Sequence, residues 1–122
     1  MARVLALVPD LLFGSRLLAA LQAAGHEVQL EADPAVTVGE LGTDAGHMDV
    51  LVVDLTDAAL DGSALVARWR EEGLLASTRT VGFYAHVDVD TREHAERAGF
   101  DLVVPRSRMA REAPELIARL GG

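Results

Sequence analysis

Runs of apolar residues alternate along this chain with longer segments in which apolar positions recur every three or four residues. The runs Arg3–Val8 and Val50–Val53 show little polar alternation, which is typical of strands buried on both faces. Glu27–Glu31 alternates polar and apolar residues, as a strand at the edge of a sheet does. Thr80–Ala85 and Leu102–Val104 complete a set of five predicted strands.

Capping residues indicate where the helices between these strands begin and end. Asp10 can cap a first helix, which Gly25 would end. A second helix belongs in Ala35–Gly46, but Gly39 and Gly42 lower its helix propensity, so we expect a short or irregular element there.

Three further helices follow the later strands. Ser63 is the expected N-cap of a helix over 64–72, and the segment Asp90-Thr-Arg-Glu93 resembles a capping box for a helix that ends at Gly99. Pro114 suits the first turn of a last helix that ends near Leu120.

Five strand and helix units in alternation predict an α/β fold in one domain over residues 1–122. Right-handed crossovers place helices on both faces of a parallel sheet, and we expect the flavodoxin-like, doubly wound strand order 2-1-3-4-5. No repeat, linker or low-complexity segment divides the chain.

Composition narrows the range of functions. The formal net charge is −8 and all eleven basic residues are Arg, so the surface should repel nucleic acid. Cysteine is absent, which removes disulfides and thiolate chemistry. No apolar run is long enough to span a membrane or to form a secretion signal. We therefore expect a cytoplasmic protein with no nucleic-acid or membrane partner.

Polar side chains follow four of the predicted strands, and the carboxyl ends of parallel strands are where open α/β sheets place their sites. Because strands one, three, four and five lie near one another in the expected order, these side chains should converge. The candidate lining residues are Asp10, Asp54, Thr56, Tyr84, Ala85, His86 and Arg106.

These residues resemble the receiver domains of two-component response regulators, over essentially the whole chain. Asp54, with Asp61 and Gly62 seven and eight residues later, is similar to the family's phosphoacceptor aspartate and its Asp-Gly pair. Ala98-Gly99-Phe100-Asp101 is similar to the Ala-Gly-Ala-Asp segment that precedes strand five. The resemblance implies that Asp54 is equivalent to the aspartate that takes a phosphoryl group from a phosphohistidine.

The chain departs from the family where receivers carry their other active-site residues. The two acids that hold Mg²⁺ after strand one are replaced by Val8 and Pro9, with Asp10 one residue late. Tyr84 stands where receivers have a small Ser or Thr, and Arg106 stands where they have Lys.

Phosphoryl transfer depends on neutralising the negative charge of the transferred group, and Mg²⁺ provides most of that neutralisation. Asp10, Asp54 and the carbonyl of Thr56 offer only a weak Mg²⁺ site, and otherwise we expect no cofactor. The planar guanidinium of Arg106 can pair with both carboxylate oxygens of Asp54. We therefore expect a degenerate receiver, or pseudo-receiver, with impaired or absent phosphorylation of Asp54.

Simpler structural roles remain open for the same residues. Asp54 can cap a turn at the end of its strand, Asp10 can serve only as a helix N-cap, and His86 can be a solvated loop residue. His26 is expected on the surface, and Trp69 is expected in the core. Other surface positions are expected for His47, His94, Arg108, Arg111 and Arg119.

Two other functional classes also remain open. A small α/β enzyme or nucleotide-binding protein could use the same edge, although no G-x-G-x-x-G motif follows the first strand. A structural subunit would need Phe83 and Phe100 exposed for docking. We expect a stand-alone receiver-like signalling protein whose partner is a sensor kinase, a downstream regulator or a second copy of itself.

Overall fold

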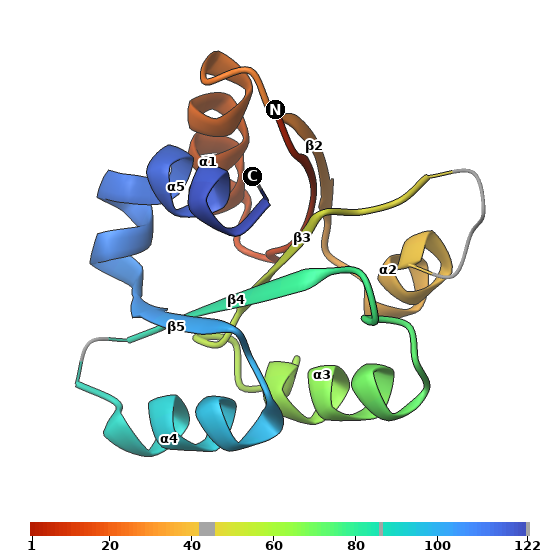
Figure 1. Cartoon of the computed structure of the whole chain (residues 1–122). Coiled ribbons are helices and arrows are strands. Elements are labelled where there is room, and N and C mark those ends of the chain that lie inside the picture. The colour runs from red at the N-terminus through yellow and green to blue at the C-terminus, as the bar shows by residue number, and fades with distance from the viewer. Residues whose placement is uncertain (42–45, 86, 122) are drawn as a thin grey trace.

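The computed structural model describes residues 1–41, 46–85 and 87–121, which form one parallel sheet with helices on both faces (Figure 1). The strands are β1 (Arg3–Leu7), β2 (Glu27–Glu31), β3 (Val50–Asp54), β4 (Arg79–Tyr84) and β5 (Leu102–Pro105). The helices are α1 (Leu11–Ala23), α2 (Pro34–Leu41), α3 (Gly62–Glu71), α4 (Val89–Ala98) and α5 (Arg106–Gly121).

The strand order is β2-β1-β3-β4-β5, with every neighbouring pair parallel, as the sequence predicts. β3 lies at the centre, where Val50 is paired with Val4 on one side and Arg79 on the other. All five residues of β3 are buried, which explains its apolar run without alternation. The central position brings the end of β3 between the loops that follow β1 and β4.

Two apolar clusters hold the helices to the two faces of the sheet. One cluster packs α1 and α5 against the sheet, through residues such as Leu21 and Leu116. The other packs α3 and α4, through Val66, Trp69 and Ala95, with α2 at its margin. Trp69 is 2% exposed, so its predicted role in the core is confirmed.

Several helix ends follow the predicted residues. Asp10 accepts a hydrogen bond from the Phe13 N–H at the start of α1. Gly25, Gly73 and Gly99 follow α1, α3 and α4 with φ of 91°, 79° and 100°, a conformation that favours glycine after a helix. The expected short second helix is the eight-residue α2.

Three predicted helix starts are wrong. Ser63 lies inside α3 and is buried, because the helix already begins at Gly62. α4 is capped by Asp88, whose side chain accepts a hydrogen bond from the Thr91 N–H, and not by Asp90. α5 begins at Arg106, so Pro114 lies in its interior, where the buried face of the helix outweighs the lost hydrogen bond.

One prediction of exposure is wrong, and burial also removes the surface that the structural-subunit alternative required. His26 is 9% exposed, and its Nδ1 accepts a hydrogen bond from the Ala2 N–H at 3.0 Å. Phe83 and Phe100 are 0% and 8% exposed, so the docking surface that a structural subunit would need from them does not exist.

Among the helices of the described residues, none is both long enough and apolar enough to cross a bilayer.

Candidate functional site

Asp54 ends β3 at the carboxyl edge of the sheet and is only 2% exposed. Its Oδ1 accepts two hydrogen bonds from Thr56, from the backbone N–H at 2.8 Å and from the hydroxyl at 2.6 Å. A carboxylate removed from water needs such partners, because burial disfavours the charged form. Asp54 therefore caps the turn that leads from β3 to α3.

The Thr56 hydroxyl should contribute measurably to stability. A hydrogen bond to a charged group stabilises a fold by about 1.5–3 kcal/mol. Thr56→Val removes the hydroxyl but keeps the shape and the backbone N–H, so we expect a loss of that size in urea unfolding. Thr56→Ser is the matched control, and an equal loss in Ser and Val would show that the 2.6 Å hydrogen bond contributes nothing.

Gly62, eight residues after Asp54, is required by a close approach of α3 to β3. A Cβ at this position would lie 2.5 Å from Val53 Cγ1 and 3.1 Å from Leu55 Cδ2. Asp61 precedes it with φ of 47°, the left-handed region that Asp tolerates better than most residues. The Asp-Gly pair therefore has a structural role here, since it admits the helix beside the strand that carries Asp54.

Arg106 pairs with Asp10 and not with Asp54. Its Nη2 donates to Asp10 Oδ2 at 3.1 Å, and its guanidinium carbon lies 4.6 Å from the centroid of the Phe13 ring. The Phe13 ring in turn lies 4.7 Å from Phe83 at an interplanar angle of 31°. The predicted pairing of Arg106 with Asp54 is wrong, because α1 offers the guanidinium both a carboxylate and an aromatic face.

The same contacts shift the pKa of the Asp10 carboxyl. The hydrogen bond from the Phe13 N–H lowers that pKa most, burial acts in the opposite direction, and the guanidinium of Arg106 lowers the pKa further. Because the folded pKa lies below the unfolded one, the folded chain binds this proton less readily. The contribution of Asp10 to stability is therefore present at neutral pH and is lost as the pH falls through the acidic range.

The other predicted lining residues do not gather around Asp54. Tyr84 is 6% exposed and belongs to the apolar cluster beneath α3 and α4, while Ala85 is exposed. His86 lies outside the described residues. Asp57 caps its own turn by accepting a hydrogen bond from the Leu60 N–H.

These side chains do not fit a magnesium ion. Asp10 uses one carboxylate oxygen for the Phe13 N–H and the other for Arg106, and Asp54 Oδ1 holds Thr56. Apolar Val8 stands where receivers carry an acid. Across the described residues, no group of three or more His, Asp and Glu side chains is arranged to hold a metal. The contacts of Asp10 and Asp54 therefore do not fit the weak Mg²⁺ site that we expected from Asp10, Asp54 and Thr56.

A cavity of about 310 Å³ lies beside the loop between β3 and α3. Its lining includes Asp57, Asp61 and Asp90 together with His94, which is exposed on α4. Asp54 and Arg106 do not line it. The hollow at this edge is thus acidic and lies to the α4 side of Asp54.

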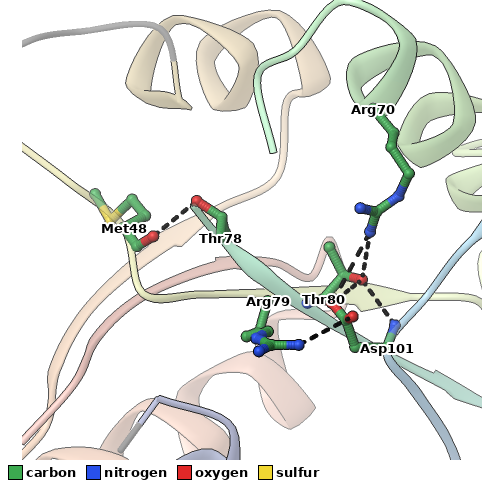
Figure 2. Close-up of polar contacts among 6 residues, drawn as sticks. All are labelled: Met48, Arg70, Thr78, Arg79, Thr80 and Asp101. Atoms are coloured by element: carbon green, nitrogen blue, oxygen red, sulfur yellow. Dashed lines mark hydrogen bonds and ion pairs between the residues drawn. The ribbon is translucent and has the colours of Figure 1, made fainter. Parts of the chain in front are cut away.

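A polar network at the opposite edge of the sheet explains the Ala-Gly-Phe-Asp segment (Figure 2). Asp101 Oδ2 accepts hydrogen bonds from the Thr80 N–H at 2.7 Å and from its hydroxyl at 3.1 Å, joining the starts of β4 and β5. Arg70 reaches this pair from α3, and a Cβ on Gly99 would lie 2.9 Å from its Nε. Sequence reasoning identified the segment by resemblance and missed this bracing role.

Phe13 is the residue of the site that sequence reasoning missed altogether. Its ring holds the Arg106 guanidinium and rests on Phe83, so it connects the rim of the sheet to the core. Its position three residues after the Asp10 cap was the available signal, because it places the ring on the turn that Asp10 closes.

Comparisons with known proteins find the same fold in solved structures. No family model matches the chain, and no curated protein matches its sequence. A putative response regulator from Chloroflexus aurantiacus gives a TM-score of 0.85 at 19% identity, with 98% of this chain and 96% of that chain covered. The chemotaxis response regulator CheY4 of Vibrio cholerae gives 0.82 at 18%, covering 98% of each chain.

The phosphorylated cyanobacterial phytochrome response regulator RcpA is a third such neighbour. It gives a TM-score of 0.81 at 15% identity, with 98% of this chain and 93% of that chain covered. At these identities the likeness shows the fold. The chain therefore has the flavodoxin-like fold of response-regulator receiver domains, as its sequence predicts.

Proposed function

We propose that this chain is a receiver-like signalling protein that acts through protein contacts, with phosphorylation of Asp54 impaired or absent. The observation that carries the proposal is the pairing of Arg106 with Asp10 and Phe13. The Arg106 guanidinium, at the end of β5, is therefore held against the start of α1 by contacts within the chain. A cytoplasmic partner, such as a sensor kinase or a downstream regulator, would recognise the conformation in which Arg106 is paired with Asp10.

Phosphorylation of Asp54 would have to disturb several contacts. Phosphorylation would replace the single negative charge of this carboxylate with the roughly two of an acyl phosphate, at a residue that is 2% exposed and already bonded twice by Thr56. Efficient transfer needs those charges neutralised by a metal and a nearby cation. Here the carboxylates do not fit Mg²⁺, and Arg106 would have to leave Asp10 and Phe13 to serve as that cation.

Intact mass measurement tests the proposal. The protein is incubated with Mg²⁺ and a small acyl phosphate donor, and we expect no added phosphoryl group under conditions that modify RcpA. Asp54→Asn serves as the control for modification at any other residue. Ready addition of one phosphoryl group to the unmodified chain, absent in Asp54→Asn, would overturn the proposal.

A further inference from the structure

The outer face of α1 lacks the charged residues that usually solvate a surface helix. Its thirteen residues include one charged side chain, Arg16, and no acid. Leu11 and Leu12 are 79% and 64% exposed. By comparison, the ten residues of α4 include five charged side chains. Exposed apolar residues with Arg and without acids are the composition of a protein interface.

A groove runs between this helix and α5. The two helices lie side by side on one face of the sheet (Figure 1), and they enclose a cavity of about 280 Å³. Small side chains keep the groove open. Its lining is Phe13, Arg16, Leu17, Ala20, Ala110 and Ala113. Such a groove between two helices can take the larger apolar side chains of a third.

Charge on this face is opposite in sign to that of the rest of the chain. Together α1 and α5 contain five Arg and two Glu, a formal charge of +3. The whole chain carries −8, so the remaining residues carry −11. Within the described residues Arg16, which lines the groove, forms no ion pair, whereas Asp10 at the start of α1 is already paired with Arg106. The groove is thus bordered by a guanidinium that is free to bind an acid.

We propose that the groove between α1 and α5 binds an amphipathic helix of a protein partner, with large apolar residues on one face and Asp or Glu beside them. The apolar residues enter between Ala20 and Ala110, and the acids pair with Arg16 and the exposed arginines of α5. The proposal deepens the proposed function, on which it rests, by assigning the partner contact to this face. A second copy is a poorer occupant, because a two-fold dimer through this face would bring two surfaces of net positive charge together.

Amide spectra of the ¹⁵N-labelled protein can test this with two synthetic helical peptides. Both carry Leu at positions that face one side of the helix, and they differ only in having Glu or Arg on the flanks. We expect the Glu peptide to produce saturable shifts confined to α1 and α5, weakening as salt is added. We expect at least tenfold weaker binding of the Arg peptide.

Two variants and one control locate the binding. Arg16→Glu reverses the charge at the groove, and Ala110→Leu fills the groove from an exposed position, so both should weaken the Glu peptide about tenfold or more, a change of about 1.4 kcal/mol. Arg68→Glu changes an arginine on α3 that is also exposed, and it should leave binding unchanged. Circular dichroism confirms that each variant is folded.

Binding of both peptides alike, shifts outside α1 and α5, or no binding of the Glu peptide would overturn the assignment. Sedimentation that shows a dimer disrupted by Ala110→Leu would assign the groove to a second copy instead. These failures leave the proposed function standing as long as Asp54 remains unmodified by the phosphodonor. Conversely, phosphorylation of Asp54 would overturn the proposed function, and the peptide titration would still show whether the groove binds a helix.

Discussion

Phe83→Ala should destabilise the protein by about 3–5 kcal/mol, measured as the free energy of unfolding in urea. Phe83 is 0% exposed in β4, next to the central strand β3, and its ring packs against Phe13. Removing the ring leaves a cavity between the sheet and α1. With few aromatic residues in the chain, the neighbouring Val and Leu side chains are too short to fill that cavity.

The matched control for Phe83→Ala is Val87→Ala. Val87 is 82% exposed, and we expect its replacement to change stability by less than about 0.5 kcal/mol. The Phe83 variant should also shift the Arg106 side-chain resonances, because Phe13 would lose the surface on which it rests. A loss below about 1 kcal/mol, with Arg106 undisturbed, would contradict the stacked arrangement.

Gly62→Ala is expected to destabilise the protein by about 1–3 kcal/mol, as overpacking of a core does. The new methyl would lie 2.5 Å from Val53 Cγ1, in a strand whose five residues are all buried. The amide resonances of Asp54 and Thr56 should move as well, since α3 and the turn before it must retreat. Thermal and urea unfolding measure the first effect, and amide spectra measure the second.

Gly39→Ala is the control for Gly62→Ala, and we expect it to have the opposite effect on stability. Gly39 lies in α2, and an added Cβ meets nothing within 4 Å. Alanine restricts the unfolded chain and favours the helix, so this variant should be about 0.4–1 kcal/mol more stable than the parent. If both substitutions had the same sign, the close approach of α3 to β3 would not be the reason for glycine at position 62.

The fold could be predicted because its elements follow from local chemistry. Val50–Val53 and Arg3–Val8 are strongly apolar, and Gly25 and Gly99 end helices through a backbone conformation that favours glycine. Pro114 misled the prediction of α5, because local propensity favoured the first turn. Burial of Met109 and Ala113 on one helix face, a tertiary effect, extends the helix back to Arg106.

The sequence predicted that Asp54, Asp10 and Arg106 lie at the carboxyl edge, but not which of them pair or that Phe13 joins them. The positions of Asp54, Asp10 and Arg106 at the carboxyl edge follow from strand order alone. Which carboxylate Arg106 selects depends on the direction of a long side chain, and an aromatic ring on α1 decides it. His26 was misplaced for a similar reason, since its contact with the Ala2 N–H joins residues that are 24 positions apart.

The proposed loss of phosphorylation is tested most directly by the amide spectrum of the protein with Mg²⁺, before and after addition of beryllofluoride, a mimic of the aspartyl phosphoryl group. We predict that the resonances of Asp54, Thr56 and Arg106 stay where they are, because the carboxylates do not fit the metal and Arg106 stays with Asp10 and Phe13. Saturable shifts of all three residues, lost in Asp54→Asn, would show a working phosphoryl site and contradict this prediction.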